Sequence, residues 1–272
     1  MGADAIWIEA YERMTLDESH AWHRHTEREI VNILDRLSSG AIARIVDVGC
    51  GDGRHSVELA ARGFDVLGLD ISAHLVTRAL PSGTANPRFQ VADARRGVPE
   101  DGFDLALCLY DVIGSSARRE DDASLVRALA RSLRPGGYLA ASVMNTGVTL
   151  GRLAPERRPM TNESFVAALE ALPPSSTMEQ SGSIFDPDHL LYFGSVYYRK
   201  EQFERGVSQL PAELVIRDRR FTRQELTDLL EGFGFEVLDV RPVQAGQWDR
   251  EPPLDDDDER AKELFVLARL RS

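Results

Sequence analysis

One segment of this sequence constrains the fold more than any other, because it reads as strand, glycine-rich turn, helix and second strand. Residues 45–48 are mostly β-branched, which is typical of a short strand, and glycines then occupy alternate positions from 49 to 53. Residues 55–63 carry apolar side chains at helical spacing, and the apolar residues 65–69 lead to Asp70. Glycines let a backbone pass close to a ligand, and the free amides at the start of a helix point toward it. The segment therefore predicts a site for a nucleotide-type cofactor.

The spacing of the glycines and the nearby charges narrow the choice of cofactor. A dinucleotide fingerprint, G-x-G-x-x-G, would need its third glycine at position 54, where the chain has Arg54. The pattern is instead D-x-G-x-G-x-G, with Asp47 two residues ahead of the first glycine. A carboxylate there disfavours a pyrophosphate and suits a cationic ligand. The alternative, a strand-helix-strand turn whose glycines serve packing only, gives no role to the carboxylates at the two strand ends.

This pattern resembles motif I of the class I S-adenosylmethionine-dependent methyltransferases, whose ligand carries a sulfonium and an ammonium but no phosphate. The resemblance implies S-adenosylmethionine as the cofactor and S-adenosylhomocysteine as the product. It also implies that the glycines lie against the methionine part, that Asp47 holds the ammonium directly or through water, and that Asp70 accepts hydrogen bonds from the ribose hydroxyls.

Four further positions match cofactor contacts of the family. Ile71 would pack on the adenine, Asp93 and the Ala94 amide would hydrogen-bond it, and Leu109 would lie under the sulfonium. A helix or turn cap is the alternative role for Asp93. The cofactor-binding residues implied by the resemblance are Asp47, Gly49, Gly51, Gly53, Asp70, Ile71, Asp93, Ala94 and Leu109.

Strand and helix signals alternate along the chain up to about position 147. Ser72 predicts the cap of a short helix, residues 88–94 predict a strand, and residues 102–111 form a nearly continuous apolar run, as expected of a buried central strand. Residues 120–145 predict a helix, a stop at residues 135–137, which are Pro-Gly-Gly, and another strand. Such alternation predicts a parallel sheet that binds ligands at the carboxyl ends of its strands.

Regular signals resume near the end of the chain. Thr222 and Glu225 form a capping box, and the helix they start is expected to end at Gly234, before a strand. Residues 255–258, four aspartates, read as a solvated loop, and residues 259–270 read as a last strand. The order matches that of the methyltransferases. The predicted fold class is α/β, a doubly wound seven-stranded, mostly parallel sheet with an antiparallel last strand, an N-terminal helical cap and an insertion after the fifth strand.

Length and composition predict a single domain over residues 1–272, because 272 residues with 43% apolar content can bury a substantial core. The resemblance implies that this is a methyltransferase domain. Residues 1–40 form the expected helical cap, since Thr15 and Glu18 make a capping box for an amphipathic helix that is expected to end at Gly40. Residues 147–215 form the expected insertion, which would act as a lid on the substrate side.

The cap and the insertion contain further candidates. The resemblance implies that the cap covers the methionine end of the cofactor, so Tyr11, Trp22 and His25 are candidates for that lid, with core packing or solvent exposure as the alternatives. In the insertion, residues 163–172 are expected to form a helix and residues 175–183 a polar loop. Residues 188–198 are aromatic and read as a strand whose side chains line a substrate pocket or simply pack.

Charge and residue usage limit the partners. A net charge of −12 would repel a phosphate backbone, so nucleic acid is an unfavourable substrate. Cys50 and Cys108 are the two cysteines, and their low number fits a reducing compartment, with the cytoplasm as the default. We expect no membrane attachment, because no charged leader precedes a sufficient apolar run. We expect no metal site either, because His23 and His25 would point apart on a helix.

Methyl transfer is an in-line displacement, so the protein must mainly position the reactants, and an acceptor hydroxyl or ammonium also needs a group that takes or orients a proton. Tyr110 and Asp111 follow the fourth strand, where the family places groups that face the acceptor. Asp111 is the first candidate, with a cap or turn as its alternative role, and His189 in the insertion is a second candidate base. The predicted catalytic residues are Asp111, His189 and Tyr110.

The layout resembles the small-molecule branch of the family, for which we expect O- or N-methylation, with C-methylation open. The alternatives are a cofactor-binding enzyme that catalyses a non-methylating step, a binding or regulatory module, and a nucleic-acid or protein methyltransferase. The last would need a basic groove, for which the arginines at positions 217, 219, 220 and 223 are the candidates. A homodimer is compatible with the sequence but not required by it.

Overall fold

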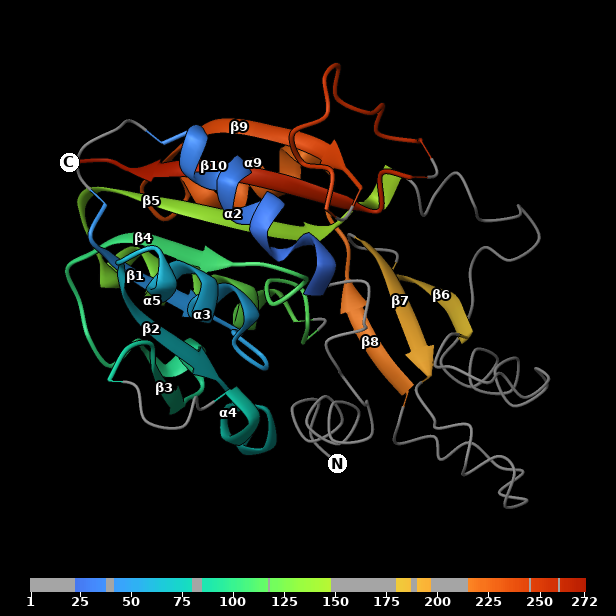
Figure 1. Cartoon of the computed structure of the whole chain (residues 1–272). Helices are drawn as coiled ribbons and strands as arrows, with labels where there is room; N and C mark the ends of the chain where they lie inside the picture. The colour runs from blue at the N-terminus through green and yellow to red at the C-terminus, as the bar shows by residue number, and fades with distance from the viewer. Residues whose placement is uncertain are drawn as a thin grey trace.

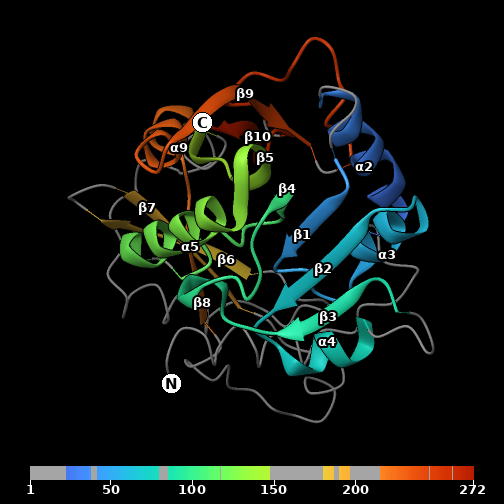
Figure 2. The same cartoon turned by 90° about the vertical axis from the view of Figure 1, so that its left-hand side faces the viewer.

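A seven-stranded sheet forms the centre of the molecule, with helices on both faces (Figures 1 and 2). The strand order is β3-β2-β1-β4-β5-β10-β9. The strands are β1 (Arg44–Val48), β2 (Asp65–Asp70), β3 (Arg88–Val91), β4 (Phe103–Cys108), β5 (Leu133–Met144), β9 (Phe235–Val243) and β10 (Glu263–Leu270). The computed structural model describes residues 23–37, 42–79, 85–116, 118–147, 180–186, 190–196, 215–244, 246–258 and 260–272.

The pairing of the strands confirms the predicted fold class. Strands β1 to β5 are mutually parallel, and β10 runs antiparallel to both β5 and β9. Every residue of β4 is buried, because helices cover both faces of the sheet and a continuous apolar run is needed there. The carboxyl ends of the parallel strands therefore meet at one edge of the sheet, where ligands bind in such folds.

Two apolar clusters fix the helices to the two faces. One face packs on α5 (Arg119–Ser132) and α9 (Arg223–Glu231), and the other on α2 (Thr26–Asp35) and α3 (Arg54–Ala61), as Figure 2 shows. The short helix α4 (Ala73–Ala79) contacts β2 and β3. None of the helices in the described ranges is long and apolar enough to cross a membrane.

Three short strands form a separate antiparallel sheet in the order β6-β7-β8. They are β6 (Gln180–Asp186), β7 (Leu190–Val196) and β8 (Val215–Arg219). The aromatic segment predicted as a strand contains β7. The polar loop expected over residues 175–183 is wrong from Gln180 onward, because pairing with β7 extends this polar stretch into β6. The helical part of the insertion predicted around residues 163–172 lies outside the described residues.

Some element boundaries differ from those predicted. The N-terminal helix is not continuous through residues 23–25, which form the 3-10 turn η1 (His23–His25), and α2 begins at Thr26, whose hydroxyl donates to the His23 carbonyl at 3.0 Å. The helix α2 ends at Asp35, before the expected Gly40. The Arg36 side chain that follows turns to the Trp248 carbonyl at 2.9 Å.

The Pro-Gly-Gly sequence does not separate α5 from the next strand. The helix ends at Ser132 and β5 begins directly at Leu133, so residues 135–137 lie inside the strand. The extra residues are absorbed by a shift in register, since Leu133 pairs with Phe103 whereas Tyr138 pairs with Leu105. The predicted strand over residues 88–94 ends early for a different reason, because Asp93 caps the 3-10 turn η2 (Ala94–Arg96).

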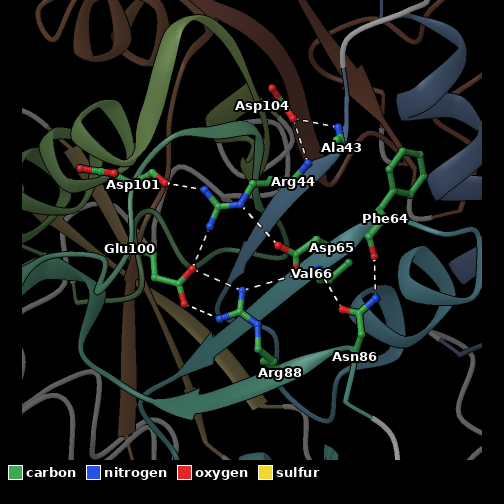
Figure 3. A network of polar contacts seen from close by, with 10 residues as sticks. All are labelled: Ala43, Arg44, Phe64, Asp65, Val66, Asn86, Arg88, Glu100, Asp101 and Asp104. Atoms are coloured by element: carbon green, nitrogen blue, oxygen red, sulfur yellow. Dashed lines mark hydrogen bonds and ion pairs between the residues drawn. The ribbon is translucent and has the colours of Figure 1, made fainter.

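A network of ion pairs joins the strands at the edge of the sheet opposite their carboxyl ends (Figure 3). Arg44 on β1 contacts Glu100 at 2.8 Å and Asp65 on β2 at 3.3 Å, and Arg88 on β3 contacts Glu100 as well. The Asp104 carboxylate on β4 accepts the Arg44 amide at 2.8 Å. These side chains hold the starts of four strands together and leave the other edge free for a site.

Candidate functional site

A cavity opens at the carboxyl ends of β1, β2 and β4 and contains about 1260 Å³ of empty space, including its mouth. The structure brings together on its wall most of the residues that the sequence predicted. Those that line it are Asp47, Gly49, Gly51, Asp70, Ile71, Asp93, Ala94, Leu109, Tyr110 and Asp111.

The glycine turn after β1 has a backbone that favours glycine. Gly49 has φ of +75° and Gly51 has φ of +58°, both in the left-handed region. A Cβ at Gly49 would lie 2.2 Å from Val112, in the loop after β4. Gly53 does not line the cavity, and a Cβ there would lie 2.6 Å from the ring of Phe89. Gly53 thus serves the packing of the helix start, whereas Gly49 lets two loops of the site approach each other.

Asp70 fastens the glycine turn to the end of β2. One of its carboxylate oxygens accepts the Gly51 amide at 2.9 Å and the other accepts the Ser72 amide at 2.8 Å. Burial raises the pKa of Asp70, and the two amide hydrogen bonds oppose that shift. Each carboxylate oxygen has a second lone pair, so Asp70 can still accept a pair of ligand hydroxyls.

Asp47 is a buried carboxylate at the floor of the cavity, with 2% of its surface exposed. The Ser56 hydroxyl donates to it at 2.7 Å, and burial raises its pKa. A cationic ligand group beside Asp47 would offset this cost of burying a negative charge.

Asp93 has two roles in the structure. It lines the cavity, and its carboxylate also caps η2 by accepting the Arg95 amide at 3.1 Å and the Arg95 side chain at 2.8 Å. The hydrogen bond from Arg95 lowers the pKa of Asp93. The alternative role of a cap is therefore present, and a contact with adenine stays a prediction.

Sequence reasoning missed a buried charged cluster behind the cavity, which consists of Glu29, Arg54, His55 and Tyr110. The Glu29 carboxylate accepts Arg54 and His55 at 2.8 Å each, and the Tyr110 hydroxyl donates to its other oxygen. Burial alone would raise the pKa of Glu29, but the hydrogen bond from His55 and the charge of Arg54 lower it to about 2.

Arg54 is the member of this cluster that changes the chemistry of the cavity. It lines the wall, and its guanidinium lies 4.7 Å from the centre of the Tyr110 ring. A cation at this point can contact a ligand carboxylate near the Asp47 carboxylate, so the two side chains together match an amino-acid zwitterion. In the sequence, Arg54 is visible as a basic residue directly after Gly53, but its place in the cavity wall could not be predicted without the fold.

Tyr110 and Asp111 follow β4 with φ values of +58° and +67°, which are uncommon for residues with a side chain. The Tyr110 amide donates to the Ser142 hydroxyl at 2.8 Å, and the Asp111 amide donates to the Ser142 carbonyl at 3.3 Å. Burial raises the pKa of the Tyr110 phenol well above its usual value. Tyr110 therefore stays protonated as a donor to Glu29, and Asp111 is the better placed of the two to take a proton.

Several other predicted residues do not reach the cavity or cannot be placed. His25 does not line it, and a Cβ at Gly246 would lie 2.2 Å from the His25 ring. His189 lies outside the described residues, as do Tyr11, Trp22, Tyr197 and Tyr198. Cys50 and Cys108 are both buried with raised pKa values, mainly because burial disfavours the thiolate, which agrees with packing roles. No group of three or more metal-ligating side chains occurs among the described residues.

The arginines near residue 220 do not form one open basic surface in the described part of the chain. Arg219 and Arg220 are 5% and 9% exposed, and Arg219 pairs with Asp122 at 2.8 Å. Arg223 is paired with Asp256 at 2.6 Å. The structure does not describe the side chain of Arg217.

Comparison with known proteins agrees with this geometry. A family model described as a methyltransferase domain matches residues 22–240. The ubiquinone biosynthesis O-methyltransferase of Stutzerimonas stutzeri is 32% identical over 120 residues, which are 42% of this chain and 50% of that protein. The chain thus spans about half the length of the curated relatives it matches.

Two solved structures show the same fold. The CcbJ methyltransferase from Streptomyces caelestis superposes with a TM-score of 0.66 at 16% identity, covering 97% of this chain and 96% of that one. The Burkholderia thailandensis 1,6-didemethyltoxoflavin-N1-methyltransferase, solved with bound 1,6-didemethyltoxoflavin and S-adenosylhomocysteine, gives a TM-score of 0.55 at 16% identity, covering 99% of this chain and 87% of that one.

Proposed function

The chain belongs to the methyltransferase-domain family, and on that premise we propose that it transfers the methyl group of S-adenosylmethionine to a small-molecule acceptor, leaving S-adenosylhomocysteine. The observation that carries the proposal is the charge pattern of the cavity. Three carboxylates lie at or near the carboxyl ends of three strands, as Asp47 inside β1, Asp70 at the end of β2 and Asp93 after β3. Arg54, which also pairs with Glu29, adds a guanidinium to the same wall. This pattern matches a ligand with an ammonium, a ribose and a carboxylate, and it would repel a pyrophosphate.

The residues present fit the cofactor. Bound S-adenosylmethionine supplies a methyl group that its positive sulfur activates. Asp47 would hold the ammonium, Asp70 would accept the ribose hydroxyls and Arg54 would pair with the carboxylate. A Cβ at Gly49 would lie 2.2 Å from the Val112 side chain, so glycine at this position lets the two loops of the cavity wall pack together. Ile71 would pack on the adenine, and Leu109 would lie below the sulfur.

On the acceptor side, Asp111 would orient the nucleophile and take its proton, with His189 as the second candidate. Tyr110, held by Glu29, would shape the wall and keep water out. This arrangement favours an acceptor hydroxyl or amine. The names of the relatives include both an O-methyltransferase and an N-methyltransferase acting on small molecules, which supports a small acceptor of one of these kinds.

The proposal gives the outer segments roles within one domain of residues 1–272. Residues 1–40 would cap the methionine end, and residues 147–215 would close the acceptor side as a lid. Strand β8 begins where the insertion ends and supports this role, because the amide of its last residue, Arg219, donates to the Gly114 carbonyl in the loop after β4. The net charge of −12 disfavours nucleic acid as the acceptor, and the two buried free cysteines favour a cytoplasmic location.

Calorimetry tests the cofactor part of the proposal. Titration with S-adenosylhomocysteine is expected to give a saturable 1:1 signal, whereas NADH and FAD give none. The reverse result, saturation by a dinucleotide and no heat from S-adenosylhomocysteine, would overturn the proposal.

Methyl transfer itself is tested with labelled S-adenosylmethionine against panels of small phenols, catechols and amines. With the acceptor that reacts, Asp111→Asn is expected to lower kcat by about 10²-fold or more, the usual share of a general base, while the Kd for S-adenosylhomocysteine changes less than twofold. The matched control is Asp249→Asn, at an exposed ion pair with Arg28. Unchanged turnover in Asp111→Asn would remove Asp111 from the mechanism.

A further inference from the structure

A buried ion pair connects the small sheet to the body of the protein. Asp122, in the first turns of α5, receives the guanidinium of Arg219, the last residue of β8, at 2.8 Å. Their side chains are 2% and 6% exposed, and the Arg219 guanidinium lies 4.4 Å from the centre of the Phe221 ring. A pair this well shielded is weakly screened by salt, and removal of one member leaves the other as a buried charge.

The loop after β4 is fastened to both members of this pair through Gly114. The Gly114 amide donates to the second oxygen of Asp122 at 2.8 Å, and the Gly114 carbonyl accepts the Arg219 amide at 2.7 Å. With φ of +101°, Gly114 has no room for a side chain, since a Cβ would lie 2.6 Å from the Arg219 carbonyl oxygen. The loop, α5 and β8 therefore meet in one close contact, which we call the Gly114 junction.

The chain continues from this junction along the end of the main sheet. Phe221 forms a parallel bridge with Asn145, its amide donates to the Met144 carbonyl at 2.9 Å, and its carbonyl accepts the Thr146 amide at 2.9 Å. Figure 1 shows β8 leading from the small sheet back to α9 beside this edge. The small sheet is thus tied to the main body at the same edge as the cavity.

The loop held at the junction is the one that carries the acceptor side of the cavity. Tyr110 and Asp111 lie four and three residues before Gly114, and both have left-handed backbones that the surrounding structure must impose. Val112 and Ser115 of the same loop also line the cavity. A shift of Gly114 would therefore move the groups that face the acceptor, whereas Asp47 and Asp70 lie on β1 and β2, which the junction does not touch.

We propose that Arg219 and Asp122 are positioning residues for the acceptor: through Gly114 they set the loop of residues 110–116 and couple it to the sheet β6-β7-β8. This proposal rests on the proposed function, since it assigns the acceptor side of the same cavity. It predicts that acceptor binding and loop order depend on the ion pair, while cofactor binding does not.

Hydrogen-deuterium exchange of the full chain tests the coupling without any acceptor. In Arg219→Met, peptides covering residues 110–116 and 215–221 are expected to exchange at least tenfold faster, while peptides covering residues 65–70 are unchanged and the Kd for S-adenosylhomocysteine stays within twofold. Arg271→Met is the matched control, because Arg271 has an exposed contact with Glu231 at 3.8 Å. Arg219→Lys, which keeps the charge, should restore much of the protection.

If Arg219→Met fails to fold, the double variant Asp122→Asn/Arg219→Met is used instead, because it leaves no unpaired buried charge. The side-chain amide oxygen at position 122 can still accept a hydrogen bond from the Gly114 amide. Faster exchange of the loop in the folded double variant supports the proposal, and wild-type protection of the loop in it overturns the proposal. With a reacting acceptor, the KM for acceptor should rise at least tenfold in Arg219→Met and in the double variant. A rise in the Kd for S-adenosylhomocysteine as large as the rise in the KM for acceptor would also overturn the proposal. Absence of methyl transfer to any acceptor would count against the proposed function and leave the exchange result intact.

Discussion

Glu29 offers the sharpest test of the buried cluster, because three partners converge on one carboxylate that is 1% exposed. Its pKa falls from 4.5 to about 2 in the folded protein. One pKa unit corresponds to ~1.36 kcal/mol, so ionised Glu29 stabilises the fold by roughly 3 kcal/mol. We expect Glu29→Gln, which keeps the shape but leaves Arg54 without its charge partner, to lower the free energy of unfolding at pH 7 by about this amount.

The same shift predicts how the effect depends on pH. The folded pKa lies below the unfolded one, so the stabilisation is complete above the unfolded pKa of 4.5 and is lost as pH falls toward 2. The difference in unfolding free energy between the wild type and Glu29→Gln should therefore shrink from about 3 kcal/mol at pH 7 to about 1 kcal/mol at pH 3. Taking the difference between the two proteins cancels the titration of the other carboxyls.

Urea denaturation followed by circular dichroism at pH 7, 5 and 3 measures these differences. The matched control is Glu58→Gln, because Glu58 pairs with Arg62 at 2.8 Å on the exposed side of α3, and such surface pairs contribute only ~0.2–1 kcal/mol. The reasoning is refuted if Glu29→Gln costs no more than Glu58→Gln, or if its cost is the same at pH 3 as at pH 7.

Three further predictions concern the cavity and its surroundings. Asp47→Asn keeps an acceptor for Ser56 but removes the charge, and calorimetry should show the Kd for S-adenosylmethionine rising by roughly 10- to 100-fold, the worth of one hydrogen bond to a charged group of ~1.5–3 kcal/mol; an unchanged Kd would contradict the ammonium assignment. In urea denaturation, Gly49→Ala should lower the free energy of unfolding more than Gly63→Ala. Both glycines have positive φ, but only at Gly49 would the new Cβ overlap a neighbouring side chain, that of Val112. Equal losses of unfolding free energy in the two variants would contradict this reasoning. Burial raises the pKa of Glu263, so its folded pKa lies above the unfolded one and the group destabilises the fold once pH exceeds the unfolded value. Glu263→Gln should therefore be more stable than the wild type at pH 8, by roughly 1 kcal/mol or more, and nearly equal to it at pH 4; a variant less stable at pH 8 would contradict this sign.

The parts of the fold that sequence predicts well are those whose signal is local. The glycine turn, the buried strand β4 and the capping box of Thr222 and Glu225 depend on spacing within a few residues, and the structure has all three. The error at β6 has the opposite origin. Its residues are polar, but their backbone groups pair with β7, so a tertiary contact overrides the local preference.

The difference between local signals and tertiary contacts also decides which residues of the site can be predicted. The predicted residues at strand ends line the cavity because parallel strands bring their carboxyl ends to one edge, whatever the loops between them contain. Glu29 could not be predicted, since its partners Arg54 and Tyr110 are 25 and 81 residues away. Arg219 and Asp122 are 97 residues apart, and in sequence Arg219 looked like one member of a basic surface cluster.

The buried charges also explain why the cavity favours a cation. The described wall has two arginines, and each pairs with a carboxylate, so a ligand carboxylate at Arg54 would share the guanidinium with Glu29. The wall also carries the carboxylates of Asp52 and Asp111, so its net charge is negative, and the two carboxylates proposed to contact the cofactor are Asp47 and Asp70. Burial raises the pKa of both, which means that their ionised forms are destabilised in the free protein. A bound cation stabilises the ionised form of Asp47 and should lower its pKa, so binding and deprotonation are linked. Cofactor affinity should therefore weaken as pH falls through the raised pKa of Asp47, and this part of the pH dependence should disappear in Asp47→Asn.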